Sequence, residues 1–80
     1  MTRQDALRML EGMLELPADS LTGTERLRGD VPWDSMSALA FLAEADKQLG
    51  LRVPGAKVME CKTVEDLLRL LEATRARPAA

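Results

Sequence analysis

The chain has 80 residues, of which 46% are hydrophobic and 30% are charged, and its net charge is −2. These values fit one small domain with a thin core and leave little room for a deep catalytic cleft. Because the sequence has no histidine, no tyrosine and one cysteine, it excludes a Ser-His-Asp or Cys-His site, an internal disulfide and an obvious zinc site.

The composition favours an all-α domain. Trp33 and Phe41 are the aromatic residues, so the core must be built from aliphatic side chains, and β-branched residues are scarce. No apolar run approaches the roughly 20 residues that a membrane span needs, and charged residues interrupt the N-terminus where a signal peptide would be apolar. We therefore expect a monomeric cytoplasmic protein without a membrane span.

The first predicted helix covers about residues 4–16. Leu7, Leu10 and Leu14 recur at helical spacing, Thr2 can cap the start, and Pro17 is expected to end the helix. Residues 17–34 follow without a sustained period and are punctuated by proline and glycine. This loop is long for a compact domain.

Three apolar residues spaced along the loop, Leu21, Leu27 and Val31, are expected to pin it to the core. We therefore predict an ordered loop.

The second predicted helix covers about residues 35–49. Asp34 and Ser35 can cap its start, and Gly50 is a suitable residue for its end. Two apolar rows occur on this helix, which is more apolar surface than a thin core can bury. The second row either contacts partners or packs against the loop or the third helix. The inner row is Ala38, Phe41, Leu42, Ala45 and Leu49, and the second row is Met36, Leu39, Ala40 and Ala43.

Two further helices are predicted, a short one over about residues 55–61 and a last one over about residues 63–73. Val58 and Cys61 are three residues apart and should face inward in the short helix. Thr63 is followed three residues later by Asp66, which resembles a capping box. A single domain over residues 1–74 and a flexible tail over 75–80 complete the expected organisation.

Two residues allow both a structural and a functional interpretation. Cys61 is either a reactive thiol or a small core side chain, and the absence of a histidine favours the core. Asp34-Ser35 is either a helix cap or a displayed hydroxyl. Free amides and the helix dipole at a helix N-terminus favour a phosphodiester attached to such a hydroxyl.

Three motifs at compatible separations carry a resemblance. They are Asp34-Ser35-Met36, the turn Gly50-Leu51-Arg52-Val53-Pro54, and the helix opening Lys62-Thr63-Val64-Glu65-Asp66-Leu67. In this pattern the chain resembles the acyl carrier protein and peptidyl carrier protein family, whose hallmark is Asp-Ser-Leu at the start of the second helix. Met36 stands here in place of leucine.

The resemblance implies a four-helix bundle with a long first loop and a short third helix. It implies that Ser35 carries 4′-phosphopantetheine, that Asp34 and Met36 complete the attachment motif, and that cargo is held as a thioester. A separate phosphopantetheinyl transferase would supply Mg²⁺ and the base, so the chain itself is not an enzyme. Trp33 would pack on the arm or fasten the loop to the second helix. The implied cargo cleft is lined by Phe41, Val53, Val58 and Cys61.

The second helix differs from fatty-acid carriers, which usually have more acidic residues there. We therefore expect partners to recognise an apolar face more than charge. The expected partners are an acyl-loading ligase or acyltransferase and ketosynthase-type condensing enzymes. A polyketide, nonribosomal-peptide or surface-glycan acylation pathway is at least as compatible as fatty acid synthesis. The expected docking residues are Met36, Leu39, Ala40, Ala43 and Glu44.

Two other functions remain open from the sequence. An unmodified helical interaction domain would have the same fold and would use Asp34-Ser35 only as a cap. A DNA-binding domain is disfavoured because the sequence contains no stripe of lysine and arginine, and no nucleic-acid partner is expected.

Overall fold

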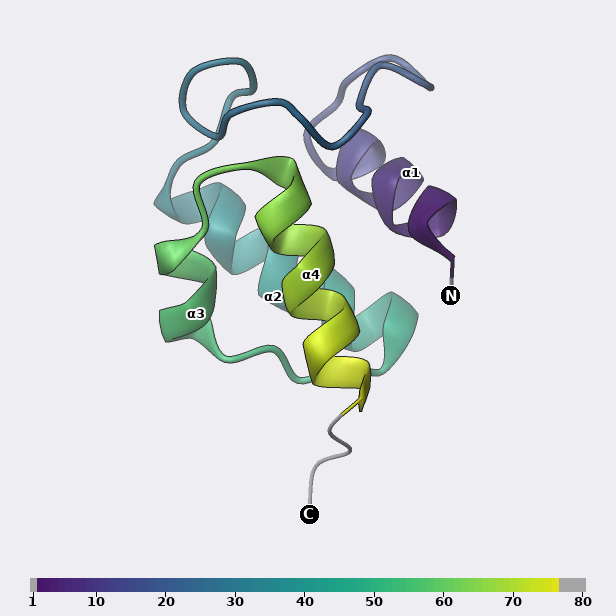
Figure 1. The fold of residues 1–80 in the computed structure, drawn as a ribbon, viewed down its shortest axis with the longest axis vertical. Helices are drawn as coiled ribbons and strands as arrows, with labels where there is room; N and C mark the ends of the chain where they lie inside the picture. The colour runs from purple at the N-terminus through teal and green to yellow at the C-terminus, as the bar shows by residue number, and fades with distance from the viewer. Residues whose placement is uncertain (1, 77–80) are drawn as a thin grey trace.

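The computed structural model describes residues 2–76, which form four helices and no strand. The helices are α1 (Arg3–Met13), α2 (Ser35–Leu49), α3 (Gly55–Glu60) and α4 (Val64–Ala76). α1 and α3 each pack against both α2 and α4, and the first loop arches over one end of the bundle (Figure 1). The predicted all-α fold with a long first loop and a short third helix is confirmed. Among residues 2–76, no helix combines the length and the apolar character that crossing a membrane requires.

The start of α1 is fixed by a reciprocal capping box. The amide of Asp5 donates to Thr2 Oγ1 at 3.1 Å, and the amide of Thr2 donates to Asp5 Oδ2 at 2.9 Å. Two amides that the helix cannot satisfy internally therefore gain partners. The predicted role of Thr2 as a cap is confirmed.

The end of α1 differs from the prediction, because the helix stops at Met13 rather than near residue 16. Glu15 adopts a left-handed backbone with φ of 58°, and the amides of Glu15 and Leu16 donate to the carbonyls of Gly12 and Glu11 at 3.3 and 2.8 Å. This pattern is a Schellman turn. The helix therefore ends before Pro17 can stop it.

α2 begins and ends at the residues that the sequence indicated, Ser35 and Leu49. Gly50 takes the left-handed conformation with φ of 66°, and the amides of Gly50 and Leu51 donate to Asp46 and Ala45 at 3.0 and 3.1 Å. A left-handed residue therefore ends both long N-terminal helices, Glu15 in α1 and Gly50 in α2, and the bond from Gly50 to Asp46 makes the end of α2 an αL motif rather than a Schellman turn.

The last two helices differ from their predicted bounds by a few residues. α3 ends at Glu60 because Cys61 is already extended, with φ of −70° and ψ of 138°. Thr63 caps α4 rather than belonging to it: the amide of Asp66 donates to Thr63 Oγ1, and the amide of Thr63 to Asp66 Oδ2, both at 3.1 Å. The predicted capping box is thus confirmed.

α4 continues to Ala76, beyond the predicted end at residue 73, since the first proline after it is Pro78. Two residues of the predicted flexible tail are therefore helical, and residues 77–80 lie outside the described part of the chain.

The core lies between all four helices and includes the first loop. Leu10, Phe41, Leu67 and Leu71 are fully buried. From the loop, three residues are buried as predicted, namely Leu21, Leu27 and Val31.

The loop is also bonded to the start of α4 through its backbone, and we call residues 23–27 with residues 62–65 the strap. The amide of Leu27 donates to the carbonyl of Lys62 at 2.8 Å. The amide of Val64 donates to the carbonyl of Glu25 at 2.9 Å, and the amide of Glu65 donates to the carbonyl of Gly23 at 2.8 Å.

Candidate functional site

Ser35 is the first residue of α2, and its side chain is exposed. The helix starts here because the Asp34 carboxylate caps it: Oδ1 accepts from the amide of Ser37 at 2.9 Å and from the Ser37 hydroxyl at 3.0 Å. Among the described residues, no group hydrogen-bonds the Ser35 hydroxyl. The neighbouring residues therefore form the cap and leave this oxygen available for chemistry.

The electrostatics at this helix start favour a negative charge. The amide and the hydroxyl of Ser37 hold the pKa of Asp34 below its ordinary value, with a weaker contribution from the positive charge of Arg28. The amides of the first turn also place partial positive charge at the N-terminus of α2. An anion attached to Ser35 would meet this field, although the Asp34 carboxylate opposes it.

Trp33 connects the exposed Asp34-Ser35 pair to the core. Its side chain is buried, and its ring meets Phe41 edge-on, with centroids 6.2 Å apart and an interplanar angle of 65°. Such aromatic pairs add stability beyond the burial of their area. Trp33 therefore fastens the end of the loop to α2, which is one of the two roles expected for it.

Trp33 also borders a hollow of about 480 Å³ between the end of the first loop and the end of α3. Apolar side chains form part of this hollow, and side chains of both charges surround it. We call it the Trp33 pocket, and it is lined by Leu27, Arg28, Trp33, Met59, Glu60, Cys61 and Lys62.

Cys61 is half-buried at this pocket, and its thiol donates to the carbonyl of Lys57 at 3.4 Å. Burial, together with the nearby charges of Asp66 and Glu60, raises the pKa of Cys61 to about 11. The thiol is therefore protonated at neutral pH and lacks the thiolate character of a reactive cysteine. This environment matches the interpretation of Cys61 as a packing residue.

The other expected cleft residues lie inside the core. Phe41, Val53 and Val58 have exposed fractions of 0%, 9% and 1%. The structure thus brings Phe41 and Val58 into the closed interior, and only Cys61 of the expected set reaches the Trp33 pocket.

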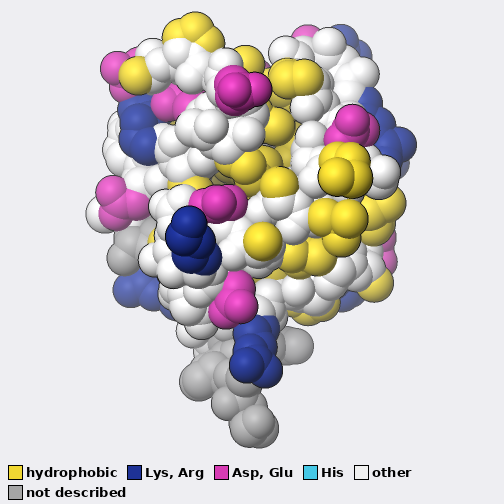
Figure 2. Space-filling model, turned by 180° about the vertical axis from the view of Figure 1, so that it is seen from behind, with side chains coloured by type: hydrophobic (Ala, Val, Ile, Leu, Met, Phe, Trp, Pro, Cys, Tyr) yellow, Lys and Arg dark blue, Asp and Glu magenta, His cyan; other side chains and the backbone are white. Residues whose placement is uncertain are grey.

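An apolar face adjoins Ser35. Met36 and Leu39 are 70% and 60% exposed on α2, and Met59 is 57% exposed on α3. Figure 2 shows apolar side chains gathered on the α2 and α3 side of the molecule. We call Met36, Leu39 and Met59 the apolar face. The expected row on α2 is thus mostly open to solvent instead of packed against the loop.

The remaining residues of the expected docking set vary in exposure. Ala43 is exposed, whereas Ala40 and Glu44 are half-buried. Met59 was not expected from the sequence; its position directly after the inward-facing Val58 in a short helix was the available signal.

Polar contacts fix the other end of the loop, and one of them involves a buried carboxylate. Glu11 is 2% exposed and accepts from the amides of Asp19 and Leu21 at 3.1 and 2.9 Å. Arg8 Nε lies 2.7 Å from Glu11 Oε1. Burial alone would raise the pKa of Glu11, but these amides and Arg8 outweigh it and hold the pKa below its ordinary value.

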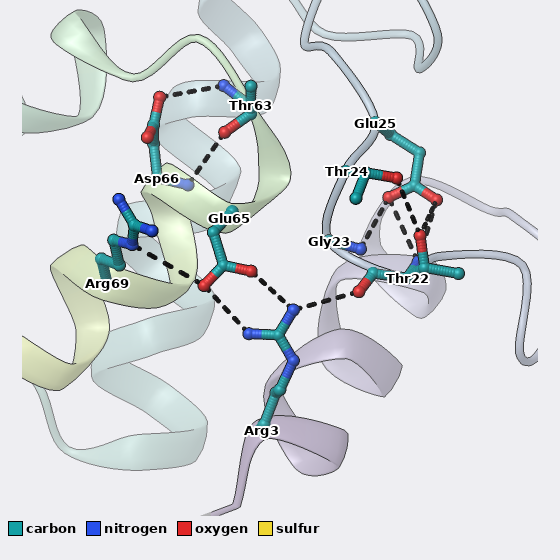
Figure 3. Close-up of polar contacts among 9 residues, drawn as sticks. All are labelled: Arg3, Thr22, Gly23, Thr24, Glu25, Thr63, Glu65, Asp66 and Arg69. Atoms are coloured by element: carbon teal, nitrogen blue, oxygen red, sulfur yellow. Dashed lines mark hydrogen bonds and ion pairs between the residues drawn. The ribbon is translucent and has the colours of Figure 1, made fainter.

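A second set of contacts joins α1, the loop and α4 (Figure 3). Arg3 donates to the Glu65 carboxylate through both terminal guanidinium nitrogens, Nη2 at 2.6 Å and Nη1 at 3.0 Å, and Nη2 also donates to the carbonyl of Thr22 at 3.1 Å. Glu25 accepts from the amides of Thr22 and Gly23, at 2.9 and 2.8 Å. We call Glu11, Glu25 and the Arg3–Glu65 pair the loop clamp. The loop clamp was not predicted from the sequence.

Comparisons with known proteins agree with this geometry. Residues 4–71 match a family model described as "Phosphopantetheine attachment site". The acyl carrier protein of Phytoplasma australiense is 30% identical over 64 residues, which cover 80% of this chain and 84% of that protein. No solved structure matches the chain. The matched range runs from α1 into α4 and contains Asp34, Ser35 and Met36.

Proposed function

Because the chain belongs to the family that carries a phosphopantetheine attachment site, we propose that Ser35 is the residue to which 4′-phosphopantetheine is joined. A member of this family is a carrier protein with a covalent 4′-phosphopantetheine and is not an enzyme. The observation that supports Ser35 is its exposed hydroxyl at the start of α2, which no described residue hydrogen-bonds. Asp34 and Met36 complete the proposed attachment motif.

The residues around Ser35 suit the group. The α2 N-terminus offers partial positive charge to a phosphodiester, and Arg28 adds a full positive charge in the vicinity. The capping bonds from Ser37 engage the Asp34 carboxylate, which limits its repulsion of a second anion. When attached, phosphopantetheine supplies a terminal thiol that holds cargo as a thioester.

The Trp33 pocket is the proposed resting place of the arm. It begins two residues before Ser35, and Trp33 and Met59 give it apolar surface, while Arg28 and Lys62 lie at its margin. Cargo would lie against Cys61 and reach the layer behind it when α3 moves. That layer consists of Phe41, Val53 and Val58.

Partner enzymes would dock on α2 beside Ser35. We assign this docking to the solvent-facing part of α2 that holds Met36, Leu39, Ala40, Ala43 and Glu44. Since these residues are mostly apolar, binding should depend weakly on salt. A steep loss of partner affinity at physiological salt would contradict this mode of docking.

The proposed partners and pathway follow from this role. A phosphopantetheinyl transferase modifies Ser35, an acyl-loading ligase or acyltransferase charges the arm, and ketosynthase-type condensing enzymes use the cargo. The cargo is an acyl or aminoacyl intermediate of a fatty-acid-like, polyketide or related specialised pathway. We propose that the chain works as a cytoplasmic monomer.

An intact-mass measurement tests the attachment site. The protein is co-expressed with a broad-specificity phosphopantetheinyl transferase, and the wild type should gain the mass of one phosphopantetheine group. Ser35→Ala should lose this gain. Ser37→Ala, which removes the neighbouring hydroxyl in the same turn, should keep it.

Two outcomes would contradict the proposal. A mass gain that persists in Ser35→Ala would move the attachment to another residue. An unmodified wild type alongside a modified control carrier would favour the alternative of an unmodified helical interaction domain, with Asp34 and Ser35 serving only to start α2.

A further inference from the structure

A second surface feature lies at the end of the molecule opposite Ser35. It is a hollow of about 630 Å³ between the α2–α3 connection, α3 and the C-terminal half of α4. In Figure 1 this end of α4 lies at the bottom, and α2 starts near the top left. We call this hollow the basic groove, and its lining includes Arg52, Pro54, Lys57, Leu70, Ala73 and Ala76.

The floor of the basic groove is apolar. Leu70 is half-buried there, and Pro54, Ala73 and Ala76 present exposed apolar atoms. Thr74 also lines the groove, but its hydroxyl already donates to the carbonyl of Leu70 at 2.8 Å. The floor therefore offers a partner contact with apolar atoms rather than free hydrogen-bonding groups.

The rim of the basic groove is positively charged. Among the described residues, its lining contains Arg52 and Lys57 and no carboxylate, although the chain as a whole has a net charge of −2. Three other hollows on the described surface each include at least one glutamate in their lining. Neither Arg52 nor Lys57 forms an ion pair with any residue in the range 2–76. Both cations are thus available to an anionic partner.

We propose that the basic groove binds an acidic amphipathic helix of a partner protein. An open groove with an apolar floor suits the apolar row of such a helix, and the two cations suit its flanking carboxylates. α4 lines the groove from Leu70 to Ala76, a wall about 10 Å long, which is enough to contact about two turns of a bound helix.

The position of the groove gives this binding a distinct use. Ser35 begins α2 and Arg52 follows its end, and an α-helix of 15 residues is about 22 Å long. A helix in the basic groove therefore leaves the Ser35 hydroxyl and the apolar face uncovered. A partner can retain the chain here while another enzyme acts at Ser35. This inference does not depend on the attachment at Ser35.

A synthetic peptide provides the test. An 18-residue amphipathic peptide with a leucine row flanked by glutamates is titrated into the full ¹⁵N-labelled chain and followed by NMR. We expect saturable shifts at the amides of Leu70, Ala73 and Lys57. A peptide with lysines in place of the glutamates should bind at least tenfold more weakly. The double variant Arg52→Gln, Lys57→Gln should weaken the acidic peptide about tenfold, as expected for two exposed ion pairs.

Two further variants distinguish binding in the basic groove from non-specific attraction between opposite charges. The double variant Lys47→Gln, Arg69→Gln removes the same charge from exposed positions outside the groove and should bind the acidic peptide like the wild type. Ala73→Glu should abolish binding without unfolding the chain, because residue 73 is exposed.

Three outcomes would overturn the proposal. The first is no saturable shift with the acidic peptide. The second is equal binding of the lysine peptide. The third is equally tight binding of dodecanoate at the same residues, which would indicate a site for a small amphiphilic anion instead of a protein helix.

Discussion

The two ends of the first loop are held in different ways. Near α1 and α4 the loop clamp uses charged groups, namely the buried Glu11, the half-buried Glu25 and the Arg3–Glu65 pair. Near α2 the loop is held by the buried ring of Trp33, and the next two residues are exposed. Polar contacts are therefore concentrated where no function is proposed, and the proposed site is left open.

This difference shows how a small chain can combine order with an accessible hydroxyl. Directional hydrogen bonds at the clamp define the path of the loop near α1 and α4. Non-directional packing of Trp33 against Phe41 holds the other end of the loop at the start of α2. Mutations at the clamp should therefore change stability, whereas mutations around Ser35 should mainly change recognition.

The largest effect on stability is expected from Glu11→Ala. It leaves two loop amides without their acceptor and removes one of the two carboxylates that pair with Arg8, and the loss of these charge-assisted hydrogen bonds should lower the unfolding free energy by about 3 kcal/mol. Urea unfolding followed by circular dichroism measures the loss. Glu72→Ala, at an exposed position, should change the unfolding free energy by less than about 0.5 kcal/mol. Equal losses in both variants would remove the distinction between clamp and surface.

Acid should weaken the clamp in the same experiment. Since the folded chain holds the pKa of Glu11 below its ordinary value, the stabilisation is present above about pH 4.3 and is lost as the pH falls through the folded pKa. The unfolding free energy should therefore fall between about pH 5 and pH 3, and Glu11→Gln should reduce that fall. A variant with the wild-type pH slope would contradict this role of Glu11.

A smaller loss is expected at the proposed site from Asp34→Ala. The variant removes the cap of α2 and should lower the unfolding free energy by about 1 kcal/mol. Asp46→Ala, on the exposed surface near the other end of the same helix, is the matched control and should not destabilise the chain. A loss of about 3 kcal/mol in Asp34→Ala would mean that the site contributes as much stability as the clamp.

A gain is expected from Glu15→Gly. Glu15 has φ of 58°, a conformation that costs an L-residue about 1 kcal/mol and glycine nothing. Thermal unfolding should show an increase of up to about 1 kcal/mol in stability. Gly50→Ala, at the equivalent position of α2, should show a decrease of similar size. A change of the same sign in the two variants would contradict the shared left-handed conformation at these helix ends.

The smallest effect on stability is expected from Leu39→Gln on the apolar face. The side chain is 60% exposed and glutamine is a good helix former, so the unfolding free energy should change by less than about 0.5 kcal/mol. Affinity for the loading enzyme should nevertheless fall about tenfold, since a leucine buried by the partner contributes roughly 1.5 kcal/mol or more. Gln4→Ala on α1 should leave affinity unchanged. An unchanged affinity in Leu39→Gln would remove the apolar face from docking.

The sequence predicted most of the fold because its signals were local. Asp34 and Gly50 are residue types that start and end helices, and α2 has the expected bounds. The predicted end of α1 was wrong because its local signal is missing. Glu15 occupies the left-handed position that ends the helix, where a glycine would have marked the end in the sequence. The role of Ser35 stays a prediction until the mass measurement is made.

The loop clamp could not be predicted because its partners are distant in the sequence. Glu11 lies four residues after Leu7 and so faces the core, but the amides that satisfy it come from the folded loop. Likewise, Arg3 meets Glu65 across 62 positions of the chain. The exposure of Met36 and Leu39 could not be predicted either. The apolar row on α2 did not show whether these side chains would pack against the loop or α3 or would face solvent.

The strap has a consequence for truncated forms of the chain. Residues 23–27 bond to residues 62–65, so a chain that ends before α4 keeps the complete Asp34-Ser35-Met36 motif but lacks the three backbone bonds between the loop and the start of α4. Charging by another enzyme should therefore require the part of the chain that contains α4, and not the motif alone.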